Sequence, residues 1–326
     1  MARDKGGHLC DLVCQPSGDT MKNVALKSFS TLAAAVALIA TLSIPARAQQ
    51  AFQSPEQAAE SLAAALRAGD QKALVALLGP GSEDVISSGD ATDDDNVRKT
   101  FLLAYDLKHS VQTKEGKTAT LLIGQDDYPF SIPIARKGDT WNFDVAAGRE
   151  ELLARRVGRN ELAAIQTCLA YVDAQNEYAE ITKVGGLSVY AQRFVSTPGT
   201  KNGLYWPSSG SEPRSPIGPA VALATLAGYR IGSGAPFNGY MFKILTRQGP
   251  KASGGEHDYL VNGKLIGGFA LIAWPAQYGN SGIATFMVNH DGDVYEKDLG
   301  EATSKAASAI AVFNPDDSWK KVKIEN

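Results

Sequence analysis

The chain has 326 residues, of which 44% are hydrophobic and 8% are aromatic, with 32 Lys and Arg against 35 Asp and Glu. This composition is globular, and it excludes disordered, collagen-like and disulfide-scaffold proteins. The net charge of -3 provides no basic surface of the kind that nucleic-acid-binding proteins carry, so we expect no nucleic-acid partner. The length fits two domains of about 100 to 200 residues each.

Residues 1–48 have the pattern of an export leader. Two lysines precede an apolar stretch over about 29–42, and Ala46 and Ala48 are the small residues that a signal peptidase accepts. The polar stretch ahead of the lysines is foreign to such a signal, so we expect translation to start at Met21. The apolar stretch is shorter than the roughly 20 residues of a membrane span. We therefore expect cleavage after Ala48 and a periplasmic or secreted mature chain without a membrane span.

Cysteine usage agrees with a chain that needs no disulfide. Cys10 and Cys14 lie in the leader, without the further Cys or His that a metal site would need. Only Cys168 remains in the mature chain, so an exported protein has no internal disulfide. Cys168 lies in a strongly helical stretch, where we expect a small buried apolar role.

The first part of the mature chain predicts three helices. Ser54, Pro55 and Gln57 form a capping box, and Gly69 follows the last apolar residue of that helix. Asp70 caps a short second helix. A third helix is expected over about 96–107, with three aspartates, Asp93, Asp94 and Asp95, at its positive N-terminal end.

Short strands follow these helices. The runs with strand character are 110–114, 117–123, 130–135 and 141–145, and turn residues separate them. Helices followed by an antiparallel meander predict an α+β domain over 49–148. Its element order resembles the cone-shaped nuclear-transport-factor-like fold.

The longest helix is expected over about 149–181, ended by Gly185-Gly186. Its apolar stripe is Leu162, Ile165, Leu169 and Val172, at spacings of three and four. A helix of that length is about 50 Å long, which is enough to form the spine of a second domain.

The rest of the chain predicts a helical piece, an antiparallel sheet and a final helix. The helical piece is 219–227, the strands are 240–248, 258–261, 268–274, 283–289 and 293–297, and the last helix is 302–313. Asn262-Gly263 and Asp291-Gly292 fit two-residue hairpin turns. The fold class is therefore α+β, with a second domain over 149–326 built from the long helix packed on this sheet.

Several segments resemble an uncharacterised exported bacterial family, domain of unknown function 2950. They are the run 149–161, Ala-Gln-Asn-Glu-Tyr at 174–178, Gly-Leu-Tyr-Trp-Pro at 203–207, 239–246, 267–270 and Tyr-Gly-Asn-Ser-Gly at 278–282. The resemblance covers essentially all of the mature chain. It implies export and a shared fold, without an established activity.

The second half also resembles the globular part of type IV pilins and pseudopilins. In those proteins a long helix with an Ala-Gln-x-x-Tyr segment precedes a small antiparallel sheet, and 281–294 is similar to their last hairpin. A pilin joins an apolar N-terminal helix directly to this spine. Here the first domain lies between them, so the resemblance does not imply incorporation into a pilus.

The motifs of common enzymes and metal sites are absent from the sequence. His109, His257 and His290 are too dispersed for a local metal motif, and HExxH, CxxC, the P-loop and GxSxG do not occur in the mature chain. We therefore predict no catalytic residue, no metal and no cofactor, and we do not expect an enzyme.

Four residues remain as binding candidates. Trp206 and Trp274 could line a groove for a peptide or sugar, although core packing explains them as well. His290 and Asp291 lie in an Asn-His-Asp-Gly-Asp run that resembles part of a calcium loop, although a hairpin turn also accounts for it.

A cluster of three arginines allows two interpretations. Arg155, Arg156 and Arg159 could grip an anion, or they could form a solvated face paired with Glu150, Glu151 and Glu161.

Two functions remain open at this point. The first is a non-catalytic, exported protein that acts by binding an envelope protein or a small ligand, as an accessory or assembly factor. The alternative is a small-ligand site or enzyme in the N-terminal domain, with a pocket around Tyr105, His109, Tyr128 and Trp141.

Overall fold

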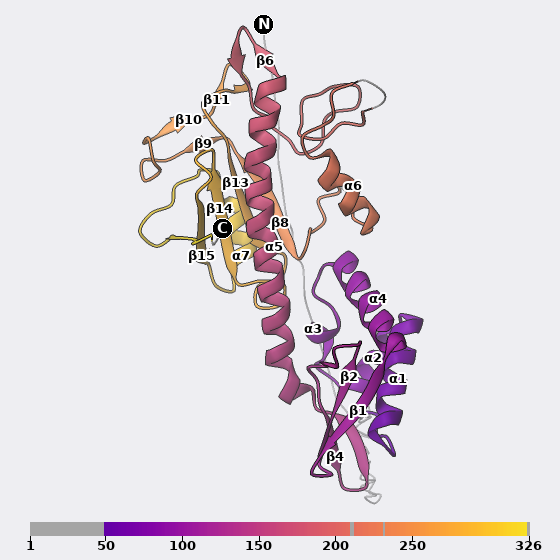
Figure 1. Cartoon of the computed structure of the whole chain (residues 1–326). Helices are drawn as coiled ribbons and strands as arrows, with labels where there is room; N and C mark the ends of the chain where they lie inside the picture. The colour runs from indigo at the N-terminus through magenta and orange to yellow at the C-terminus, as the bar shows by residue number, and fades with distance from the viewer. Residues whose placement is uncertain (1–48, 209–211, 231, 325–326) are drawn as a thin grey trace, which may run out of the picture. The chain divides into compact units, whose positions relative to one another are not determined.

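The computed structural model describes residues 49–208, 212–230 and 232–324 (Figure 1). The fold is α+β, as predicted, and the described residues belong to one compact unit. The expected export leader, with Cys10 and Cys14, lies outside the described residues. Among the helices that the structure describes, none combines the length and the apolar character that crossing a membrane requires.

Helix α1 (Pro55–Ala68) and helix α2 (Gln71–Leu78) begin and end at the predicted caps. The Ser54 hydroxyl accepts the Gln57 N–H at 3.1 Å, and Gly69 closes α1 with a φ of 62°. Asp70 accepts two N–H groups at the start of α2. The Gln57 side chain accepts the N–H of Gln53 rather than that of Ser54, so half of the capping box is shifted by one residue.

The prediction for the third helix was wrong at its start. Helix α4 (Ala91–Leu107) begins five residues earlier than expected, because Asp90 caps it and accepts the N–H groups of Thr92 and Asp93. The short helix α3 (Glu83–Ile86), which the sequence pattern did not predict, precedes it.

The first sheet is an antiparallel meander packed against these helices. Its strands are β1 (His109–Lys114), β2 (Thr118–Ile123), β3 (Tyr128–Pro129), β4 (Ile134–Lys137) and β5 (Thr140–Phe143), in the order β1-β2-β4-β5 with β3 paired to β2. The predicted strand over 130–135 is split. Pro129 and Pro133 flank the break, and a proline has no N–H to donate to a ladder.

Helix α5 (Val145–Ile181) is 37 residues long, which corresponds to about 55 Å. It begins four residues before the expected start, where the Asp144 carboxylate accepts the Ala147 N–H at 3.1 Å. It ends at Ile181, ahead of the expected glycine pair. Gly185 and Gly186 instead form the turn of the hairpin β6 (Lys183–Val184) and β7 (Leu187–Ser188), each with a positive φ.

The predicted apolar stripe of this helix was wrong at one of its members. Leu162 is 64% exposed. The buried line has helical spacing but includes polar residues: Asn160, Ala164, Cys168, Tyr171, Gln175 and Tyr178. Asn160 donates to the carbonyl oxygen of Ser281 at 3.0 Å, so this polar side chain is satisfied by a distant segment.

Helix α5 packs along the second antiparallel sheet (Figure 1). The strand order is β16 (Lys320–Lys321), β15 (Val294–Asp298), β14 (Ala284–Asn289), β13 (Ala270–Pro275) and β8 (Tyr240–Leu245). Helix α7 (Thr303–Ala309) also contacts this sheet and is shorter than the helix expected over 302–313. Helix α6 (Gly218–Leu226) agrees with the predicted helical piece.

Two small hairpins complete the chain. The first is β9 (Arg247–Gln248) with β10 (His257–Asp258), and the second is β11 (Leu260–Val261) with β12 (Lys264–Leu265). Asn262 and Gly263 turn the second hairpin with φ values of 48° and 73°, as predicted. The prediction for Asp291-Gly292 was wrong, because Val288 pairs with Val294 and five residues connect them. Only Gly292 of that pair has a positive φ.

The buried side chains form two separate hydrophobic clusters. One lies between the first helices and the first sheet, from Phe52 to Val145, and the other lies between α5 and the second sheet, from Ala164 to Phe313. The domain boundary after residue 148 stays a prediction, and α5 runs across it.

Candidate functional site

A hollow of about 950 Å³ lies where helices α1 to α4, the loop after β2 and the first turns of α5 come together. We call it the large hollow. Most of its lining is apolar and comes from side chains that the amphipathic helices and the sheet turn inward. These are Leu62, Leu66, Leu74, Leu78, Val85, Ile86, Val97, Phe101, Ala104, Ile123, Phe130, Ile132 and Leu152.

Charged residues from two helices also line the large hollow, with Asp93 to Asp95 on α4 and three arginines on α5. The two groups meet in one ion pair, in which Arg159 Nη2 donates to Asp93 Oδ2 at 2.8 Å. The Asp93 side chain is only 14% exposed. Burial raises the pKa of Asp93 above its ordinary value, and the nearby Arg159 charge opposes that shift.

Arg156 is held in place by main-chain carbonyl groups. It donates to the oxygens of Asp84 and Val85 at 2.7 and 3.0 Å, and to the side chain of Asn280. Asn280 in turn donates to the Ser87 carbonyl oxygen at 2.9 Å. Burial lowers the pKa of Arg156, which nevertheless remains cationic because a guanidinium is not deprotonated in proteins. Arg156 therefore ties α5 to the segment around α3.

Arg155 also lines the large hollow and is more exposed than Arg156. Its Nε donates to Glu151 at 2.5 Å, and its guanidinium lies 5.0 Å from the centre of the Tyr128 ring. The pairing with Glu151 agrees with the predicted solvated face. Glu161 pairs with none of the three arginines, and it accepts the N–H groups of Ile283 and Ala284 instead.

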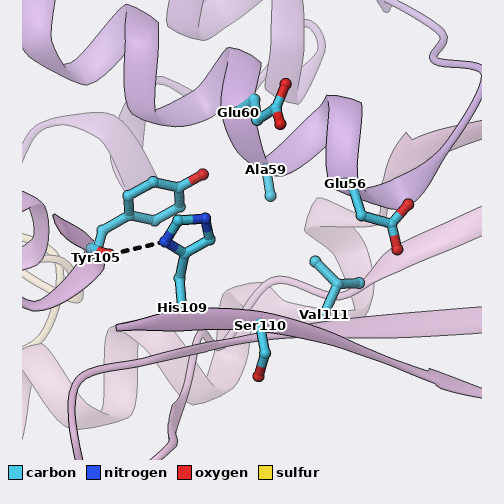
Figure 2. Close-up of a pocket in the computed structure, with 7 residues that line it drawn as sticks. All are labelled: Glu56, Ala59, Glu60, Tyr105, His109, Ser110 and Val111. Atoms are coloured by element: carbon cyan, nitrogen blue, oxygen red, sulfur yellow. Dashed lines mark hydrogen bonds between the residues drawn. The ribbon is translucent and has the colours of Figure 1, made fainter. Parts of the chain in front are cut away.

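A second pocket, of about 200 Å³, lies between α1, the end of α4 and β1 (Figure 2). We call it the small pocket. Its lining residues are Glu56, Ala59, Glu60, Tyr105, His109, Ser110 and Val111. The Tyr105 and His109 rings stack with their centres 3.8 Å apart, and His109 Nδ1 lies 2.8 Å from the Tyr105 carbonyl oxygen.

The four residues of the predicted N-terminal pocket do not share one site. Tyr105 and His109 line the small pocket, and Tyr128 lines the large hollow. Trp141 is 8% exposed, belongs to the core cluster, and lines neither of the two.

The two tryptophans singled out from the sequence lie in the core of the second sheet. Trp206 is 3% exposed, its Nε1 donates to the Pro213 carbonyl oxygen at 3.1 Å, and its ring meets that of Tyr178 edge-on. Trp274, on β13, is 7% exposed. Core packing accounts for both positions, and neither residue lines the large hollow or the small pocket.

His290 and Asp291 lie in the turn between β14 and β15. The His290 ring contacts the rings of Tyr259 and Phe269 edge-on. Its Nδ1 is buried and has no hydrogen-bond partner among the described residues. Asp291 accepts from the Asn289 side chain at 3.1 Å, as expected in a polar turn. In the described part of the chain, no three His, Cys, Asp or Glu residues come close enough to hold a metal ion.

Sequence reasoning missed the large hollow. The apolar faces of the first helices were correctly expected to point inward, but periodicity does not show whether the space they face is filled. The arginine cluster and Tyr128 were the local signals, and Asp93, the partner of Arg159, lies 66 residues earlier in the chain.

Comparison with known proteins gives one match. The family model described as protein of unknown function (DUF2950) matches residues 49–322, in agreement with the resemblance found in the sequence. Neither the curated proteins nor the solved structures include a match to this chain.

Proposed function

Because the chain belongs to the DUF2950 family, whose description assigns no activity, we propose a function from the geometry: the protein binds a small amphipathic molecule in the large hollow. The observation that carries this proposal is a volume of about 950 Å³ with a mostly apolar lining that also includes aspartates of α4 and arginines of α5. We call these charged residues the rim. That volume lies at the upper end of the 300 to 1,000 Å³ range, roughly, of ligand pockets.

The lining supports a ligand with an apolar body. Leucine, isoleucine, valine and phenylalanine side chains from helices α1 to α5, from β2 and from the segment 130–132 line the space. Each Å² of apolar surface that a ligand removes from water there contributes about 25 cal/mol. Six of the lining side chains are already buried, so this gain comes from the partly exposed ones, which include Leu66, Phe101, Phe130 and Leu152. A ligand that covers these gains affinity without a specific polar contact.

The arginines that line the large hollow link the helices around it. Arg156 donates to carbonyl oxygens of α3 and Arg159 donates to Asp93 on α4, so both hold α5 against its neighbours.

The setting we propose is the periplasm or the exterior of a bacterial cell. The support for this comes from the sequence pattern of 1–48, in which an apolar stretch ends at the small residues Ala46 and Ala48. The likenesses to pilins and to the nuclear-transport-factor-like fold stay predictions, and the proposed function depends on neither.

Two substitutions on α4 test the proposal. Val97 lines the large hollow and is 44% exposed. Val97→Trp therefore adds a large ring to the lining without disturbing the core. Leu103 lies on the same helix, is 73% exposed and does not line the hollow, which makes Leu103→Trp the matched control.

The measurement is a fluorescence titration with anilinonaphthalene sulfonate, an amphipathic anionic dye. We expect V97W to weaken dye binding at least about tenfold, which corresponds to about 1.4 kcal/mol, and L103W to leave it within about twofold. Unfolding curves establish that both variants are folded. Equal binding by the two folded variants contradicts the proposal.

A further inference from the structure

The small pocket is separate from the large hollow, because the two have no lining residue in common. Figure 2 shows Glu56 and Glu60 on α1, across from the stacked rings of Tyr105 and His109, with the Ala59 side chain between them. Each of the polar side chains that line this space can accept a hydrogen bond, and the two carboxylates can only accept.

The hydrogen bond of His109 determines which ring nitrogen accepts. A carbonyl oxygen only accepts, so the contact between Nδ1 and the Tyr105 carbonyl oxygen places a proton on Nδ1. In the neutral ring, Nε2 then carries a lone pair. Figure 2 shows this second nitrogen on the side of the ring that faces α1.

Tyr105 contributes the hydroxyl of a nearly buried side chain. The residue as a whole is only 4% exposed, and it lines the small pocket. Burial and the nearby Glu60 charge raise the pKa of Tyr105, so the phenol stays protonated and its oxygen also accepts.

The two glutamates bring negative charge to the small pocket. They are four residues apart on α1 and are solvent-exposed, and Glu56 lies in the first turn, where the helix dipole favours an acidic residue. Like charges at this spacing repel each other, and a cation between them removes that repulsion.

We propose that the small pocket binds a primary alkylammonium group. Its N–H groups only donate, which suits a pocket whose lining offers the acceptors of Glu56 and Glu60, the Tyr105 oxygen and His109 Nε2. The alkyl part then contacts the side chains of Ala59 and Val111.

The geometry favours an organic cation over a metal ion. A metal ion needs its ligands within about 2.0 to 2.6 Å, and no three His, Cys, Asp or Glu in the described chain come that close together. An alkylammonium group does not need three ligands at one point, because one or two acceptors hold it and its alkyl part fills the rest of a pocket of about 200 Å³.

The test uses n-butylammonium as the probe and the amide NMR signals of Glu56, Ser110 and Val111 as the readout. We expect E56Q/E60Q to weaken binding at least about tenfold and Y105F to weaken it severalfold. Glu115 and Glu301 are exposed and lie outside the small pocket, so E115Q/E301Q makes the same charge change and is expected to stay within about twofold of the parent.

Three results overturn the proposal. The first is an equal loss of affinity in the control variant, which shows attraction to net charge alone. The second is equal binding of neutral n-butanol, which shows an apolar contact only. The third is Mg²⁺ shifting the same amide signals at lower concentration than butylammonium, which shows a metal site. The dye titration of V97W is independent of all three.

Discussion

Asp90 connects the N-terminal helices to the second half of the chain, and Asp90→Asn is the change that we analyse in most detail. The carboxylate is 2% exposed. Its Oδ1 accepts the N–H groups of Thr92 and Asp93, both at 3.1 Å, and so caps α4. Its Oδ2 accepts the Tyr229 hydroxyl at 3.1 Å and the Gly239 N–H at 3.0 Å.

The expected cost follows from these four donors. In the asparagine variant one of the two oxygens becomes an NH₂ group, which has no lone pair to offer. The Gly239 N–H then stays buried without a partner, which costs about 1 to 3 kcal/mol. The Tyr229 hydroxyl also loses a charged acceptor, which is worth about 1 kcal/mol more than a neutral one. We therefore expect the free energy of unfolding to fall by about 2 to 4 kcal/mol.

Asp70→Asn is the matched control. Asp70 caps α2 through two N–H groups, is exposed, and has no contact with a distant segment. Asparagine caps helices about as well as aspartate, so D70N is expected to change stability by less than about 0.5 kcal/mol. Urea unfolding followed by circular dichroism measures both. If D90N and D70N unfold at the same urea concentration, the assigned role of Asp90 is wrong.

Two further predictions concern α5. Gly148→Ala is expected to destabilise the protein by about 1 to 3 kcal/mol, because a Cβ there lies 2.5 Å from Cα of Ile132. Gly158→Ala adds a Cβ that meets no atom within 4 Å, so it is expected to stabilise the protein by up to about 1 kcal/mol. Thermal unfolding of both variants checks the pair, and equal melting temperatures contradict it. Cys168 is fully buried and its pKa is raised to about 12, so we expect the thiol reagent dithiobis(nitrobenzoate) to label it only in denaturant. Labelling under native conditions contradicts the assigned burial.

The elements that the sequence predicted best are those with local signals. Ser54, Asp70 and Gly69 act on N–H and carbonyl groups within a few residues of themselves, so their sequence context is sufficient. The Asn262-Gly263 turn is local in the same sense, because its φ values depend on those two residues alone.

The start of α4 shows where local signals become ambiguous. Four aspartates, at positions 90, 93, 94 and 95, are all suitable caps. Only Asp90 also accepts hydrogen bonds from Tyr229 and Gly239, which lie 139 and 149 residues away. The tertiary contacts therefore selected the cap, and no reading of residues 90–107 alone could have done so.

The buried face of α5 was misread for a related reason. Hydrophobicity favoured Leu162 as an inward residue, although the buried line runs through Asn160 and Gln175. The Gln175 side chain accepts the Ala191 N–H and donates to the Ala191 carbonyl oxygen, both at 2.8 Å. A polar side chain can be buried when a distant backbone satisfies it, and the partner is visible only in the folded chain.

The rim of the large hollow combines both kinds of signal, and this has a consequence for the ligand. The Arg155–Glu151 pair is local, with a spacing of four, whereas Arg159 reaches Asp93 and Arg156 reaches backbone oxygens around α3. Since these arginines are already engaged, a polar group of the ligand has to displace an existing partner to bind one of them. The net gain from such an exchange at a half-exposed rim is small. Affinity must therefore come mainly from the apolar lining, so we expect it to increase with the apolar surface of the ligand more than with its charge.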